Sequence, residues 1–167
     1  MKPLLAPRAA RRLLSAAKKP LTASMDPSAH TVLDRPTVAT DFSALARHQH
    51  CLLVTYKRDG SAVPAPVWFA IDGDRLYVWT EINAYKAKRL ARDERALIAP
   101  CGPTGKPLGD PIMAVGRVLE SEAERGHAAK VIRRSWGPGR RAFEWLSRPI
   151  TDVHYLEFTP AVHAPID

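Results

Sequence analysis

The chain has 167 residues, the length of one domain that is large enough to bury a hydrophobic core. Hydrophobic residues make up 46% of it and charged residues 25%, a balance that excludes fibrous and wholly disordered classes. The chain contains no run of about 18 apolar residues, so the sequence predicts no transmembrane helix and no membrane partner.

The net charge of +8 suggests a nucleic-acid partner at first sight. However, residues 1–24 contain six of the 25 basic residues and no acidic residue. The other 19 basic residues are nearly balanced by the 17 acidic ones. Because most of the excess charge belongs to one terminal segment, we expect no nucleic-acid partner.

Residues 1–40 are predicted to be a basic, disordered N-terminal extension followed by a linker or extended arm. Residues 8–19 would be amphipathic as a helix, as in a transit peptide or a surface-binding arm. Met25 is a plausible alternative translation start. The folded domain is predicted to cover residues 41–167.

The body of the chain predicts a mainly β protein with inserted helices. Asp59-Gly60 and residues 72–74 are turn signals that join the first three strands into a meander. Ser121 and Glu124 form a capping box that opens a helix reaching about Ser135. The expected strands are residues 51–56, 62–71, 76–80, 96–101, 112–120 and 152–159, and the other expected helices are residues 42–48, 82–92 and 140–147. Six strands at short intervals favour a closed or half-closed antiparallel barrel.

Cys51 and Cys101 each lie in an apolar stretch without metal-ligand spacing, so both are predicted to be buried free thiols in a reducing compartment. His48 and His50 could share one face of a strand, but no third ligand lies near them in sequence. We therefore expect no metal site. No glycine-rich dinucleotide or phosphate loop occurs either.

The strongest chemical signal is a hydroxyl followed by a cluster of cations. Thr80 ends a predicted strand, and Lys86, Lys88 and Arg89 lie in the helix that follows it. Cations, a hydroxyl and the free amides at the start of a helix suit an anionic phosphate. The alternative is an ordinary solvated basic face of an amphipathic helix.

The second signal lies in the strand at residues 62–71. Pro64 and Pro66 cannot donate ladder hydrogen bonds, so this strand is expected at an edge, at a bulge or where a non-strand partner pairs with it. A flat aromatic ring could lie against that backbone, with Trp68 and Phe69 packed nearby. The alternative is that both aromatic residues are simply part of the core.

Taken in order, residues 53–80, with the continuation at 86–95 and the strand at 96–101, resemble the pyridoxamine-5′-phosphate-oxidase-like split-barrel superfamily. The pattern is closest to its flavin/deazaflavin oxidoreductases of class B, which include F420-dependent enzymes. The resemblance covers roughly residues 42–160. It departs from the family where Asp93-Glu94 replaces the usual Asn/Asp-Pro pair at the end of the helix.

The resemblance implies a six-stranded antiparallel split β-barrel that forms a homodimer, with the cofactor at the interface. By position, Thr80, Lys86 and Lys88 match the phosphate-binding residues, with Arg89 as a neighbouring candidate. The ring of the cofactor would lie along Pro66, Val67 and Trp68, and Trp136 and Trp145 are weaker candidates for lining the partner's site.

The implied activity is that of a coenzyme F420-dependent oxidoreductase, which transfers a hydride between the deazaflavin and an unidentified small organic substrate. No catalytic side chain is assigned. An FMN-dependent oxidoreductase and a non-catalytic flavin- or haem-binding split barrel remain alternatives. The free cysteines and the F420 resemblance both favour the cytoplasm.

Overall fold

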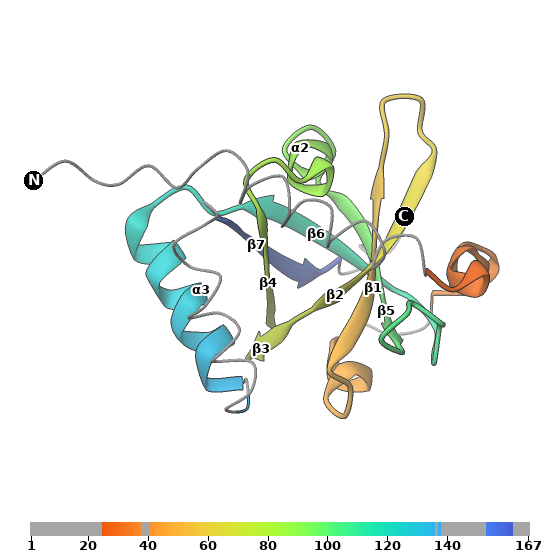
Figure 1. The fold of residues 1–167 in the computed structure, drawn as a ribbon, viewed down its shortest axis with the longest axis horizontal. Coiled ribbons are helices and arrows are strands. Elements are labelled where there is room, and N and C mark those ends of the chain that lie inside the picture. Colours follow the sequence, from red (N-terminus) through yellow and green to blue (C-terminus); the bar gives the residue numbers. More distant parts are fainter. Residues whose placement is uncertain (1–24, 38–40, 136, 138–152, 162–167) are drawn as a thin grey trace, which may run out of the picture.

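The computed structural model describes residues 25–37, 41–135, 137 and 153–161 (Figure 1). Two short 3-10 helices precede the first strand, a short α-helix follows the fourth strand, and a longer α-helix precedes the last described strand. The strands are β1 (His50–Tyr56), β2 (Ala62–Trp68), β3 (Ala70–Asp72), β4 (Arg75–Glu81), β5 (Arg95–Cys101), β6 (Ile112–Val118) and β7 (Val153–Pro160). The helices are η1 (Pro27–Asp34), η2 (Ser43–Leu45), α2 (Tyr85–Leu90) and α3 (Glu122–Ser135).

The described strands form one antiparallel sheet in the order β2-β1-β5-β6-β7-β4-β3. This confirms the antiparallel barrel expected from the sequence, but with seven strands rather than six. The difference arises at Phe69, which separates β2 from β3 within the single strand that was predicted for residues 62–71. Gly60 and Gly73 have positive φ angles in the two predicted hairpin turns, a conformation that glycine adopts without strain.

The break at Phe69 lets consecutive segments of the chain, β2 and β3, form the two opposite edges of the sheet. β2 pairs with β1, while β3 pairs with β4. Beyond Tyr77, β4 pairs with β7 on one edge but has no β3 partner on the other. Figure 1 shows β2 and β4 diverging from β3, with α2 beyond the far end of β4. We call this divergence the seam, meaning the facing edges of Ala62–Trp68 and Val78–Glu81.

The interior of the barrel is apolar and is closed at one end by α2. Leu53 of β1, Val78 of β4 and Phe158 of β7 belong to the main core cluster. Ala87 and Leu90 of α2 join the same cluster, so the helix is held by apolar packing on its inner face. That packing directs the remaining side chains of α2 to the rim of the barrel and the nearby solvent.

Residues 25–37 contain more structure than the predicted linker. η1 begins after Asp26, whose side chain accepts hydrogen bonds from the Ser28 backbone at 2.8 Å and from its hydroxyl at 2.6 Å. Ala29 and Val32 of η1 are fully buried against the outer face of the β1 and β5 strands. The expected helix at residues 42–48 is only the short turn η2, and the expected helix at 140–147 lies outside the described residues.

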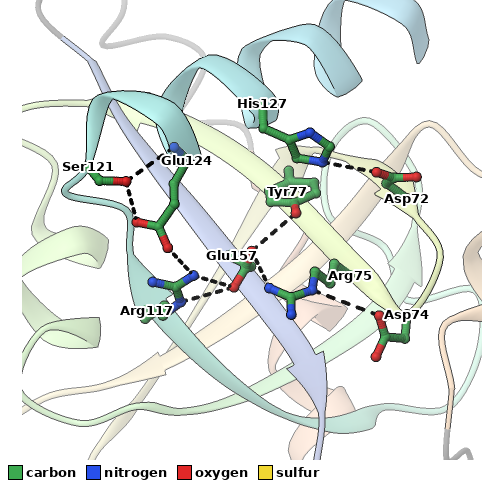
Figure 2. Close-up of polar contacts among 9 residues, drawn as sticks. All are labelled: Asp72, Asp74, Arg75, Tyr77, Arg117, Ser121, Glu124, His127 and Glu157. Carbon is green, nitrogen blue, oxygen red and sulfur yellow. Dashed lines mark hydrogen bonds and ion pairs between the residues drawn. The ribbon is translucent and has the colours of Figure 1, made fainter.

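The predicted pair Ser121 and Glu124 begins α3, with both contacts made through the Ser121 hydroxyl. The Glu124 backbone N–H donates to Ser121 Oγ at 3.2 Å, and that hydroxyl donates to Glu124 Oε2 at 2.9 Å. Arg117 of β6 then donates to Glu124 Oε1 at 2.7 Å. The first turn of α3 is therefore tied to the outer face of the sheet (Figure 2).

Glu157 on β7 is the centre of the polar network beneath α3 (Figure 2). Its carboxylate accepts from Arg75 Nη1 at 3.0 Å, from the Tyr77 hydroxyl at 3.1 Å and from Arg117 Nε at 3.0 Å. Burial alone would raise the pKa of Glu157, but the hydrogen bonds from Arg75 and Arg117 lower the pKa overall. This buried carboxylate thus joins β4, β6 and β7.

Both cysteines are free and buried, as predicted. Cys51 packs in the main core and Cys101 in the cluster beneath η1, so the two thiols face opposite sides of the sheet. Burial raises the pKa of both thiols, in the case of Cys101 to about 12. Within the described ranges, no helix is long and apolar enough to cross a membrane.

Candidate functional site: a cationic corner at the seam

The strand β4 delivers Thr80 to the barrel end that α2 covers. Thr80 follows Leu76 and Val78 at alternate positions, so its side chain faces the interior, and it is 5% exposed. Lys86 lies in the first turn of α2, and its Nζ donates to the Thr80 hydroxyl at 3.3 Å. The structure thereby brings these two predicted site residues together.

Arg89 extends the same group of polar side chains toward β1. It lies one turn after Lys86 and donates from Nε to Thr55 Oγ1 at 2.8 Å. Thr55 is 1% exposed and continues the inward-facing alternation of Cys51 and Leu53. Thr55, Thr80, Lys86 and Arg89 together form what we call the cationic corner.

The two cations of the corner are held in an unfavourable electrostatic setting. Burial lowers the pKa of Lys86, and the nearby Arg89 charge lowers it further, although Glu81 has the opposite effect. Burial also lowers the pKa of the Arg89 guanidinium. Among the described residues, no carboxylate comes within ion-pair distance of either cation. An anion bound here would therefore relieve repulsion as well as gain hydrogen bonds.

Lys88 does not join the corner. Its side chain is exposed, and its Nζ lies 5.7 Å from the ring centroid of Tyr85, which is itself 74% exposed. α2 spans six residues rather than the eleven expected at 82–92, and the contacts described at the corner are made by side chains. The contribution of Lys88 to phosphate binding remains a prediction.

The predicted ring segment lies on the other side of the seam. Ala70 of β3 pairs with Tyr77 of β4, and continuing that register would set Val67 opposite Thr80. β2 and β4 diverge before that point, so the edge of β2 that faces away from β1 is not paired with β4. This agrees with the sequence argument that the prolines mark an edge.

The side chains of the ring segment point in alternate directions. Val67 packs against the main core, whereas Pro66 pairs with Leu52 and shares its outward face. Trp68 pairs with His50, and its indole Nε1–H donates to His50 Nε2. Because Pro66 cannot donate, a flat ring at this edge would find backbone carbonyls beside apolar side chains.

Thr55 is the member of the corner that sequence reasoning did not single out. The signal was present, because Thr55 lies two positions after Leu53 on a strand that is otherwise apolar on that face. The pairing with Arg89 depends on where α2 crosses the barrel, which no local pattern specifies. Trp136 and Trp145 lie outside the described residues.

A separate cavity of about 760 Å³ lies away from the cationic corner. Its lining includes Phe42 beside η2, Ile71 of β3 and Ser135 at the end of α3. None of the residues predicted to bind a cofactor lines it. We place the candidate site at the corner because cations, hydroxyls and an unpaired strand edge meet there, whereas the described lining of the cavity contains no lysine or arginine.

No protein-family model and no curated protein matches the sequence. Solved structures do match. They include the haem storage protein HutZ from Vibrio cholerae, with 16% identity over 69% of this chain and 83% of that chain and a TM-score of 0.52. A general stress protein 26-related protein of the pyridoxinephosphate oxidase family from Clostridium acetobutylicum shares 15% identity over 70% of this chain and 78% of its own, with a TM-score of 0.52.

An FAD-binding protein from Mycobacterium smegmatis is 13% identical over 76% of this chain and 91% of that chain, with a TM-score of 0.51. At such low identity these matches identify the fold and not the ligand. The sequence resemblance had predicted the same architecture from the order of residues 53–101. The chain therefore has the split-barrel fold of the pyridoxamine-5′-phosphate-oxidase-like proteins.

Proposed function

We propose that the chain is an oxidoreductase that binds a phosphate-bearing flavin or deazaflavin, with coenzyme F420 as the preferred cofactor and FMN as the alternative. The observation that carries the proposal is the cationic corner. Lys86 and Arg89 are partly buried, lie next to each other and contact the hydroxyls of Thr80 and Thr55. The preference for F420 comes from the sequence resemblance to the class B oxidoreductases.

The residues present fit a phosphate group. Lys86 offers a point charge with rotatable donors, and Arg89 offers N–H groups beyond the one bound to Thr55. Each hydroxyl can accept from its cation while donating to a phosphate oxygen. The corner therefore supplies both charge and directional hydrogen bonds, and the desolvation that disfavours two bare cations would strengthen their attraction to an anion.

With the phosphate at the corner, the ring system would extend along the seam toward β2. The unpaired edge of β2 would hold it through backbone atoms near Pro66, while the core behind Val67 would exclude water from one ring face. When bound, the cofactor supplies the hydride chemistry, and the chain orients its ring toward the substrate. No described side chain is assigned as a proton donor.

Equilibrium titration tests the proposal most simply. The purified full-length chain is titrated with F420 and with FMN while absorbance and fluorescence are followed. Micromolar binding of F420, together with oxidation of reduced F420 by an added electron acceptor, is the expected result. Failure of both ligands to bind at micromolar concentrations would overturn the proposal.

A non-catalytic haem-binding role is the second candidate because the fold is shared with the haem storage protein HutZ. Among the described residues, His50 accepts a hydrogen bond from Trp68 at Nε2, which that nitrogen would have to give up to bind iron. Haem titration separates the two roles. A Soret band that saturates at one equivalent, with no turnover of reduced F420, would favour haem storage.

We also propose that two copies of the chain associate, as the resemblance implies. Met113 and Val115 lie on the outer face of the central strand β6, and they are 37% and 42% exposed. Exposed apolar side chains in the middle of a sheet are typical of a surface that a partner covers. Light scattering should give twice the chain mass of 18.5 kDa, and a monomer at working concentration would contradict this.

A further inference from the structure

A third cation follows the two cations of the corner. Arg92 lies three residues after Arg89, as Arg89 lies three residues after Lys86, and backbone hydrogen bonds continue the helical turn to this point. The Arg92 N–H donates to the Arg89 carbonyl at 3.1 Å. Cβ atoms at this spacing are about 5–6 Å apart on a helix surface. The three cations therefore form a short row.

Arg92 is fixed at the end of β1 beside the corner. Its Nη2 donates to the Tyr56 carbonyl at 2.9 Å, while Arg89 contacts the preceding residue, Thr55. The charge of Arg92 also lowers the pKa of Arg89, after burial as the larger cause. The two arginines therefore repel each other next to a site that is already cationic.

Two acidic groups lie near the row, and neither forms an ion pair with it among the described residues. The charge of Arg92 helps to lower the pKa of Asp93, but Arg95 donates to both Asp93 carboxylate oxygens, at 2.9 and 2.7 Å. At the other end of the row, the charge of Glu81 raises the pKa of Lys86, which burial and Arg89 lower. Among the residues that the structure describes, no carboxylate forms an ion pair with Arg92.

We propose that Arg92 is a specificity-determining residue that binds a second anionic group of the ligand, one helical turn from the phosphate held by Lys86 and Arg89. This rests on the proposed function, because it assumes that the corner binds a phosphate. The ligand would then carry two separated anionic groups. Two sources share that chemistry, namely the second phosphoryl group of a flavin dinucleotide and a carboxylate on the tail of a deazaflavin.

The spacing supports this assignment. One phosphate can contact Lys86 and Arg89 together. Arg92 lies six residues after Lys86, about 9 Å farther along the helical axis, and its side chain is directed to Tyr56. Arg92 is also exposed, so its interaction with the first phosphate is screened by salt. A ligand with one anionic group would leave Arg92 without an anionic partner, whereas a ligand with two would reach it.

The test compares FMN, FAD and F420 by fluorescence titration at physiological ionic strength. The variants are Arg92→Gln, Arg92→Lys, and Lys130→Gln as a charge-matched control on α3, where Lys130 is exposed and distant in sequence. We expect Arg92→Gln to weaken FAD or F420 at least tenfold and FMN less than twofold. Arg92→Lys should restore most of the affinity, and Lys130→Gln should behave like the unchanged chain.

The affected ligand identifies the source, since loss of FAD affinity indicates the diphosphate and loss of F420 affinity indicates the carboxylate tail. An Arg92→Gln chain that binds all three ligands as the unchanged chain does would overturn the inference and leave the proposed function standing. An equal loss for FMN would also overturn it, because Arg92 would then act on the first phosphate. If the unchanged chain binds none of the three, the proposed function fails and this inference fails with it.

Discussion

Arg89 Nε donates to the Thr55 hydroxyl at 2.8 Å, which joins the helix after β4 to the end of the first strand of the barrel. The residues are 34 positions apart in sequence. Thr55 is almost completely buried, and Arg89, which is partly buried, loses part of its hydration there. The contact orients the guanidinium at the rim of the barrel, beside Lys86 and Thr80.

Replacing Thr55 with valine tests that orientation, because valine keeps the shape and removes the hydroxyl. Arg89 Nε would lose its acceptor, and we expect ligand affinity to fall several-fold, on the order of 1 kcal/mol. Isothermal titration against F420 and FMN measures the loss. Thr159→Val on β7 is the matched control, and equal affinities of the two variants would show that Thr55 does not orient Arg89 for binding.

The carboxylate of Glu157 makes stability depend on pH in the acidic range. Its pKa is lowered in the folded chain, so its contribution is complete above the ordinary glutamate pKa of about 4.3 and is lost as the pH falls toward the folded value. We expect Glu157→Gln to cost about 1–3 kcal/mol at pH 7 and much less at pH 3. Urea unfolding at a series of pH values measures both quantities.

The matched control for Glu157→Gln is Glu122→Gln at the exposed start of α3. It removes the same charge without touching the buried network, so its effect on the free energy of unfolding should stay within about 0.5 kcal/mol. A Glu157→Gln chain whose unfolding free energy keeps the pH dependence of the unchanged chain would show that another group causes it.

Gly116 is required where β6, β7 and α2 come together. A Cβ at this position would overlap two ring carbons of Phe158 and lie 3.0 Å from Leu90 Cδ1. We expect Gly116→Ala to destabilise the fold by about 1–3 kcal/mol and to shift α2, which carries the cationic corner. Gly126→Ala in α3 meets open space and should stabilise the fold by up to ~1 kcal/mol through helix propensity. Thermal unfolding of both variants checks the opposite signs.

Local patterns in the sequence predicted most of the barrel. Apolar alternation, the glycine turns and the capping box of α3 each specify a nearby structure, and the described strands follow them. The break at Phe69 could not be read in this way, because it depends on which neighbour each half of the strand meets across the barrel. Lys86 was identified from its spacing after Thr80, whereas Thr55 requires a contact across 34 positions.

The same limit applies to η1, which composition alone placed in a linker. Ala29 and Val32 are the two residues of η1 that are fully buried, and they pack against residues of β1 and β5. We expect Val32→Ala to destabilise the chain by about 1–2 kcal/mol, as for a core valine. Leu33 is 38% exposed, so Leu33→Ala should lower the free energy of unfolding by less. Chemical denaturation measures both variants, and equally small effects would show that η1 does not contribute to the folded core.

In the proposed function, Lys86 and Arg89 hold the phosphate of a redox cofactor. Direct titration of F420 and FMN into the wild-type chain, Lys86→Ala and Lys88→Ala measures how much each lysine contributes to binding, with Lys88 as the exposed cation of the same helix. We expect Lys86→Ala to weaken binding at least tenfold, and Lys88→Ala to have a smaller effect because its side chain lies over Tyr85. Unchanged affinity in the Lys86→Ala chain would show that Lys86 does not hold the phosphate.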